Sequence, residues 1–189
     1  SHNVPTADRA YLVNRVAAEK HPDAKFTAFG GLCLNRPVGG LNPDAVETSL
    51  KLGAKVIWLP TNTAENHYRK NGKDPSKGVV VTRDGKAVDE LQDIFALVKQ
   101  YNAVLATGHI GAEECFPVVE AARAAGVEKI VITHPEFWVV GMTPEQQADI
   151  VRKYDVLLES VYAQPVNGSY KINIPDNIAA MKAIGPEHF

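Results

Sequence analysis

The sequence predicts an α/β fold, a parallel (β/α) barrel of the TIM type that is incomplete. Strand-like and helix-like segments alternate along the 189 residues, which is typical of a parallel sheet with crossover helices. Two strand-like runs, 103–109 and 129–135, have a histidine at their ends, His109 in the first and His134 just before Pro135 in the second, and are separated by one helix of ordinary length. Only five clear strands are expected, whereas an eight-stranded barrel takes about 250 residues.

The expected strands are short runs rich in β-branched and aliphatic residues: Lys25–Cys33, Lys55–Leu59, Ala103–Gly108, Lys129–Thr133 and Val156–Val161. The expected helices are amphipathic segments: Ala7–Lys20, Pro43–Leu52, Val88–Tyr101, Ala112–Ala125, Pro144–Tyr154 and Pro175–Ile184. Thr6, Asn42 and Thr143 stand where helix N-caps are expected. A single domain over residues 1–189 follows from this pattern. The first residues resemble a loop leaving an absent strand, so we expect a barrel truncated at both ends; a smaller, complete open sheet is the alternative.

The link between Pro60 and Val88 is much longer than the roughly 2 to 6 residues of an ordinary strand-to-helix loop. We therefore expect an inserted loop at about 61–88. Within it, Arg83-Asp84-Gly85 lies between β-prone residues, and Asp-Gly in that setting predicts a hairpin. A long loop at the carboxyl end of a barrel strand often shapes an active site, although a surface decoration fits equally well.

Composition excludes several classes of protein. The balance of 20 basic against 22 acidic residues gives no nucleic-acid signature. The longest apolar runs are far shorter than the roughly 20 residues that span a bilayer, and no export signal is evident. The cysteines, Cys33 and Cys115, are too few for a disulfide framework. We expect a cytoplasmic protein that acts on a small molecule and binds neither nucleic acid nor membrane. The sequence does not fix the oligomeric state, and a homo-oligomer is one option.

His109 and His134 carry the strongest chemical signal. Equivalent ends of neighbouring parallel strands converge on one site, so the two imidazoles are placed to bind the same metal ion. Neutral imidazole suits zinc, manganese or iron, and such a metal activates a bound water near neutral pH. We expect a divalent metal cofactor, zinc above the others. The plainer interpretation is that each histidine only caps a strand end by hydrogen bonding.

Four further residues are candidates for the same site. Glu159 stands near the end of an apolar strand, where a carboxylate needs a partner, and we expect it to act on protons as the catalytic residue; a structural salt bridge is the alternative. His2, His67 and Arg69 are candidate substrate contacts. For His67 and Arg69, which lie in the inserted loop, the alternative is a solvated surface charge. For His2 the alternative is a frayed, solvated terminus.

Several of these motifs together resemble a known family. Ser1-His2-Asn3, Thr107-Gly108-His109-Ile110-Gly111 and Ile130-Val-Ile-Thr-His134-Pro135 are similar to motifs of the amidohydrolase-like superfamily of metal-dependent TIM-barrel hydrolases, in particular an uncharacterised prokaryotic branch. The resemblance implies that the chain runs from just after strand two to the start of strand eight of a (β/α)8 barrel. It also implies that His109 and His134 are the metal-binding histidines of strands five and six.

The chain also departs from the superfamily pattern. The His-x-His of strand one and the Asp of strand eight have no counterpart here, and strand four ends in Pro60-Thr61 where many members carry a bridging lysine or glutamate. A one-metal site therefore fits better than a two-metal centre. The function expected is a metal-dependent hydrolase whose metal-activated water attacks an amide, ester, lactone or similar bond. A metal-dependent phosphoesterase and a non-catalytic α/β ligand-binding or scaffold protein are the alternatives.

Overall fold

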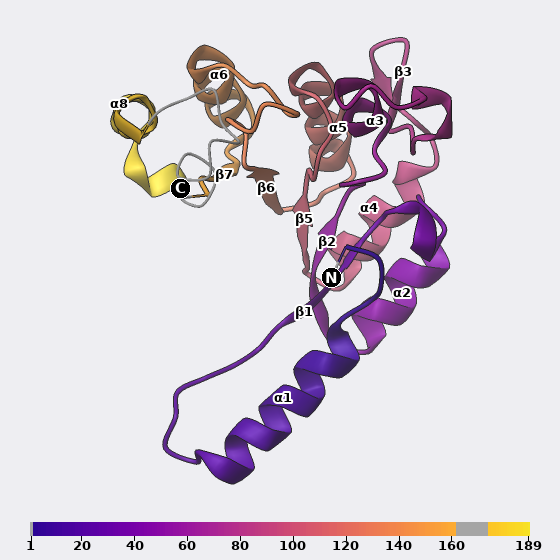
Figure 1. Ribbon diagram of the computed structural model, residues 1–189, viewed down its shortest axis with the longest axis vertical. Coiled ribbons are helices and arrows are strands. Elements are labelled where there is room, and N and C mark those ends of the chain that lie inside the picture. The colour runs from indigo at the N-terminus through magenta and orange to yellow at the C-terminus, as the bar shows by residue number, and fades with distance from the viewer. Residues whose placement is uncertain (1, 162–173) are drawn as a thin grey trace.

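The computed structural model describes residues 2–161 and 174–189 (Figure 1). Its centre is a five-stranded parallel sheet with the strand order β1-β2-β5-β6-β7. The strands are β1 (Gly30–Cys33), β2 (Ala54–Trp58), β5 (Val104–Ala106), β6 (Lys129–Thr133) and β7 (Leu157–Glu159). This all-parallel arrangement confirms the predicted α/β fold and is consistent with part of a TIM-like barrel.

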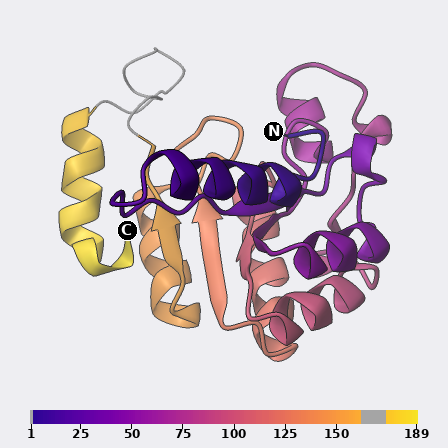
Figure 2. The same ribbon diagram turned by 90° about the horizontal axis from the view of Figure 1, so that it is seen from below.

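Helices alternate with these strands, as a parallel sheet requires. They are α1 (Ala7–Lys20), α2 (Pro43–Lys51), α3 (Glu65–Lys70), α4 (Leu91–Gln100), α5 (Ala112–Ala124), α6 (Pro144–Tyr154) and α8 (Ile174–Ile184), with short 3₁₀ turns η1 (Arg36–Val38), η2 (Pro75–Lys77) and η3 (Pro186–His188). Figure 2 shows α2, α4, α5 and α6 covering one face of the sheet. By contrast, α1 extends away from the sheet in Figure 1, and only its first residue, Ala7, is buried.

The two faces of the sheet have different side chains because successive residues of a strand point to opposite sides. One face is the apolar core, where the strand side chains are at most 3% exposed: Leu32, Ile57, Leu105, Ile130, Ile132 and Leu158. The residues that alternate with them include Cys33, Trp58, Thr133 and Glu159, which line a cavity on the other face. The strand pattern therefore separates a structural face from a face with chemically active groups.

The predicted strand Ala103–Gly108 is shortened to Val104–Ala106, and the two edge strands of the described sheet are also shorter than predicted, for one physical reason. The first was predicted to begin at Lys25, but regular pairing with β2 begins only at Gly30 opposite Ala54. Residues before Gly30 have no neighbouring strand to bond among the described residues, and Phe26 and Phe29 are exposed. The last predicted strand, 156–161, is reduced in the same way to the three residues that pair with β6. Strand length here depends on the partner strand as well as on local sequence.

Two of the three predicted helix N-caps are confirmed, and the third is not. Asn42 accepts hydrogen bonds from the backbone of the first turn of α2, and Thr143 accepts one from the backbone N–H of Gln146 in α6. Thr6 precedes α1 but its side chain makes no capping bond. Its hydroxyl instead bonds both the N–H and the carbonyl of Gly31, at 2.9 and 3.1 Å. The predicted cap was therefore wrong: Thr6 ties the N-terminal segment to the edge of β1.

The inserted segment has a defined structure. It contains α3, η2 and a hairpin of β3 (Thr82–Arg83) and β4 (Lys86–Ala87). Asp84 and Gly85 form the turn with positive φ angles of 51° and 72°, as the Asp-Gly signal predicts. Across the described residues, no helix has both the length and the apolar character needed to cross a membrane.

Candidate functional site

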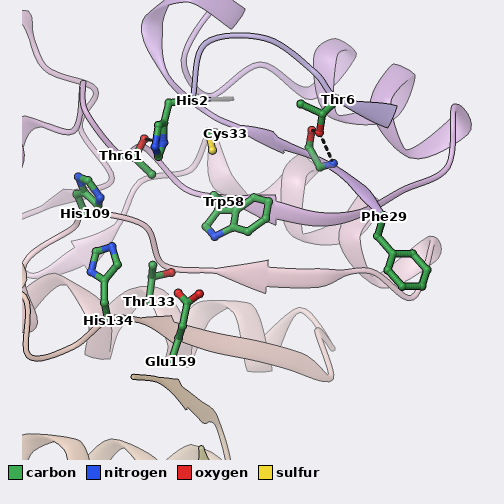
Figure 3. Close-up of a pocket in the computed structure, with 11 residues that line it drawn as sticks. His2, Thr6, Phe29, Cys33, Trp58, Thr61, His109, Thr133, His134 and Glu159 are labelled. Carbon is green, nitrogen blue, oxygen red and sulfur yellow. Dashed lines mark hydrogen bonds between the residues drawn. The ribbon is translucent and has the colours of Figure 1, made fainter. Parts of the chain in front are cut away.

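A cavity of about 320 Å³ opens on the sheet face opposite the core, at the carboxyl ends of the strands (Figure 3). Its lining combines imidazoles, a carboxylate, hydroxyls and aromatic rings. The lining residues are His2, Thr6, Phe29, Gly31, Cys33, Trp58, Thr61, His109, Thr133, His134 and Glu159. Four of the six residues predicted for the site thus line one cavity: His2, His109, His134 and Glu159.

His109 and His134 lie together, as the ends of β5 and β6 predict. Their ring centres are 5.0 Å apart, and the rings are tilted by 55°. Phe137 packs against both rings, with its centre 5.5 Å from His109 and 5.0 Å from His134. His134 has a positive φ of 29°, a conformation that costs energy in a non-glycine residue and that is frequent at functional sites.

A reciprocal pair of threonine hydrogen bonds fixes the two strand ends relative to each other. The Thr133 hydroxyl accepts from the backbone N–H of Gly108 at 3.0 Å. The Thr107 hydroxyl accepts from the backbone N–H of Thr133, also at 3.0 Å. Both threonines are buried. Gly108 directly precedes His109, and Thr133 directly precedes His134. The two hydrogen bonds therefore set the spacing of His109 and His134.

Gly108 allows the sharp turn that leads from β5 into His109. Its φ is 65°, and a Cβ at this position would lie 2.5 Å from the carbonyl oxygen of Leu59 and 2.7 Å from that of Pro60. A side chain would therefore collide with backbone that cannot easily move. His109 itself donates its backbone N–H to the Pro60 carbonyl at 2.9 Å, which anchors the histidine to the end of β2.

Burial keeps the two imidazoles neutral. Loss of solvation lowers the pKa of His109 to about 3 and the pKa of His134 to about 4. Near pH 7 each ring therefore carries a lone pair that a metal ion or a proton donor can use. The Nδ1 atom of His134 is buried and has no hydrogen-bond partner among the described residues.

Glu159 comes from the end of β7 and borders the same cavity. Glu159 is exposed as a whole residue, and partial desolvation raises the pKa of its carboxyl group, which brings proton transfer closer to neutral pH. Its neighbour in register, Thr133 on β6, also lines the cavity. In Figure 3 the carboxylate lies below the indole of Trp58 and beside Thr133.

His2 borders the cavity on its opposite side. Its Nδ1 lies 3.1 Å from the Thr61 hydroxyl, and its backbone carbonyl accepts from the Asn35 amide at 2.7 Å. Asn35 is fully buried, and its amide oxygen also accepts from the backbone of Thr61 and Thr63. Ser1, which belongs to the same sequence motif, lies outside the described residues.

The two loop candidates occupy different places. His67 on α3 lies next to His109 and is not among the residues that line the cavity. The two rings are nearly coplanar and meet edge to edge, with their Nδ1 atoms 2.8 Å apart and their centres 4.9 Å apart. Arg69 forms an ion pair with Glu65 at 3.0 Å on the surface of the same helix, with 53% of its side chain exposed. It likewise does not line the cavity.

Several residues of the site were missed from the sequence. Trp58 and Cys33 share the cavity-facing positions of their strands. Because Val56, Ile57 and Trp58 are all apolar, no period-two alternation marked which of them faces the cavity. Asn35, Asn66 and Thr133 position other groups by hydrogen bonds over long sequence distances, which leave no local signal. Buried Glu136 follows His134 closely, and neither of its carboxylate oxygens has a hydrogen-bond partner in the described structure.

The histidine pair fits a divalent metal. Two imidazoles that share a tetrahedral zinc ion, each about 2.0 to 2.1 Å from it, have ring centres roughly 5 Å apart. The ring centres of His109 and His134, 5.0 Å apart, meet that requirement. However, no group of three or more His, Cys, Asp or Glu side chains within residues 2–161 and 174–189 is placed to hold one ion. The described residues thus offer two candidate imidazole ligands and no complete ligand set.

Fold and cavity together define an all-parallel α/β protein with a histidine-lined cavity at the carboxyl ends of its strands. Residues 1–159 match a family of unknown function, DUF6282, and the chain belongs to that family. No curated protein matches the sequence.

Proposed function

We propose that the protein is a metal-dependent hydrolase of the amidohydrolase type that acts on a small molecule. The observation that carries this proposal is the convergence of His109 and His134, both neutral, beside the carboxylate of Glu159 in one cavity. The position of the cavity also supports the proposal, because active sites of parallel barrels lie at the carboxyl ends of the strands. The motif resemblance to the amidohydrolase-like superfamily agrees with this assignment.

In this proposal His109 and His134 hold one divalent metal ion, with zinc the first candidate and manganese and iron the others. When bound, the metal supplies a water of lowered pKa and polarises the bond under attack. The remaining ligands come from water, substrate or groups outside the described residues. His109 and His134 contribute lone pairs without first losing a proton, because burial keeps them neutral.

Glu159 is the proposed proton carrier. It borders the cavity, and partial desolvation raises the pKa of its carboxyl group, which suits a group that takes a proton from water and returns it to a leaving group. Trp58 and Phe29 supply apolar surface for the substrate. His2 supplies a polar contact on the opposite wall.

The cavity favours a carbon-centred substrate over a phosphoester. None of its described lining residues is lysine or arginine, whereas phosphate sites usually present cationic side chains or helix N-termini. A neutral or weakly polar ester, lactone or amide matches this lining better. The phosphoesterase alternative therefore has no specific support from the described residues.

The test is a hydrolysis assay with the full-length protein reconstituted separately with Zn²⁺, Mn²⁺ and Fe²⁺. The panel contains carboxylic esters, lactones, amides and phosphomonoesters. We expect metal-dependent hydrolysis of a carbon-centred substrate, at least 100-fold slower in Glu159→Gln and unchanged in Glu19→Gln, which alters an exposed glutamate of α1. Hydrolysis that survives Glu159→Gln would remove the proposed proton carrier. Binding of panel members without turnover would favour a ligand-binding protein.

A further inference from the structure

The inserted segment holds His109 from the side away from the cavity. The Asn66 amide of α3 donates to the His109 carbonyl at 3.1 Å and to the Val139 carbonyl at 2.8 Å. The next residue, His67, places its Nδ1 2.8 Å from the Nδ1 of His109. Asn66 is buried, so these contacts are shielded from water. Backbone and ring of His109 are thus both fixed by consecutive residues of one short helix.

The ring of His109 is confined on several sides. The His67 ring meets its edge at an interplanar angle of 20°, while Phe137 and His134 pack against it at ring-centre distances of 5.5 and 5.0 Å. Its Nδ1 is taken by His67, and the ring borders the cavity. The other ring nitrogen, Nε2, is therefore the one left for a ligand.

A hydrogen bond between two neutral imidazoles has a direction, because each ring has one N–H donor and one acceptor nitrogen. If His109 donates through Nδ1, its Nε2 keeps a lone pair. If His109 accepts, its Nε2 carries the hydrogen and cannot bind a metal. Histidines that bind metals usually donate their second ring N–H to a neighbouring acceptor, which fixes the tautomer.

We propose that His67 is a positioning residue that accepts the Nδ1–H of His109 and thereby holds a lone pair on His109 Nε2 for the cavity. The direction of this bond rests on the proposed function, since a metal ligand needs that lone pair. His67 acts through His109, because it lies next to that ring and is not among the residues lining the cavity. This role differs from the substrate contact expected from the sequence. In this proposal the inserted segment functions to orient His109.

Two substitutions of His67 separate its hydrogen bond from its packing. His67→Phe keeps an aromatic ring beside His109 but removes the acceptor. His67→Asn loses the ring but keeps an amide oxygen at about the place of Nδ1. His21→Phe, at an exposed histidine after α1, is the matched control.

The first readout is the tautomer of His109 in the metal-free, full-length protein, measured by ¹⁵N NMR of the imidazole nitrogens. We expect a protonated Nδ1 and an unprotonated Nε2 in the unsubstituted protein, in His67→Asn and in the control, and a mixture of tautomers in His67→Phe. The second readout is Zn²⁺ affinity by competition with a chromogenic chelator. It should fall about 10- to 100-fold in His67→Phe and stay near the original value in His67→Asn.

The outcomes distinguish this inference from the proposed function. A protonated Nε2 on His109 in the unsubstituted protein would overturn the inference without any variant having to fold. An unchanged tautomer in His67→Phe would also overturn it. If zinc binding were weaker in that case, His67 would be a candidate ligand of the ion itself. A tautomer shift in His67→Phe together with no zinc binding by any form would support the positioning role while refuting the metal site.

Discussion

Replacing Thr133 by valine tests how the two histidine-bearing strand ends are held together. The substitution keeps the β-branched shape but removes the hydroxyl that accepts from the Gly108 backbone N–H at 3.0 Å. Thr133 is 4% exposed, so water cannot easily replace the lost acceptor. The bond from Thr133 N–H to the Thr107 hydroxyl involves only backbone on the Thr133 side and should persist.

The expected cost follows from the orphaned Gly108 N–H. Leaving a buried donor unsatisfied costs about 1 to 3 kcal/mol, which exceeds the small gain from burying an extra methyl group. For a domain of this size, each kcal/mol lowers the melting temperature by about 2 to 4 °C. We therefore expect Thr133→Val to lower the melting temperature by about 2 to 12 °C.

The assay is thermal and urea denaturation of metal-free protein followed by circular dichroism. The matched control is Thr48→Val, because Thr48 is exposed on α2 and its substitution should change the unfolding free energy by less than about 0.5 kcal/mol. If Thr133→Val were as stable as the original protein, or if the control lost as much, the hydrogen bond across the strand ends would not be a structural determinant of the site.

Three further predictions concern the same region. Gly108→Ala should lower the unfolding free energy by at least about 2 kcal/mol, because positive φ and a contact of 2.5 Å with the Leu59 carbonyl add together; denaturation that matches the original protein would contradict the turn described. Asn35→Ala should cost about 2 to 3 kcal/mol in the same measurement, since it leaves the buried N–H of Thr61 without an acceptor, and an unchanged midpoint would speak against that network. At pH values between its pKa of about 3 in the folded protein and its ordinary pKa of 6.5, His109 binds fewer protons in the folded state than in the unfolded state. Metal-free protein should therefore lose stability as pH falls below about 6.5, by up to about 1.4 kcal/mol per pH unit from this residue. Urea midpoints at pH 7 and pH 5 should show a smaller difference in His109→Phe, and equal differences would mean that the ring is not desolvated.

Local signals predicted most of the fold. Periodicity and capping residues predicted the helix α6 with the bounds that the structure shows, Pro144–Tyr154, and its N-cap at Thr143. The Asp84-Gly85 pair gave the hairpin turn. Strand ends were less predictable because Gly30 begins β1 only where β2 offers a partner, and that information lies in the pairing of distant segments.

The candidate site was predictable to the extent that it follows from strand topology. Parallel strands place their carboxyl ends together, so His109, His134 and Glu159 could be brought into one cavity from the sequence alone. The contact between His67 and His109 spans 42 residues and depends on how the inserted segment folds back. No spacing rule indicates such a contact, which is why His67 was expected to meet substrate.

Metal content is the measurement that tests the central claim most directly. Purified full-length protein, His109→Ala and His134→Ala would be analysed by elemental mass spectrometry before and after reconstitution, with His21→Ala as the control. The account predicts about one zinc, manganese or iron ion per chain in the original protein and in the control, and loss of that ion in both site variants. No bound metal in the original protein after reconstitution, or full retention in both site variants, would contradict it.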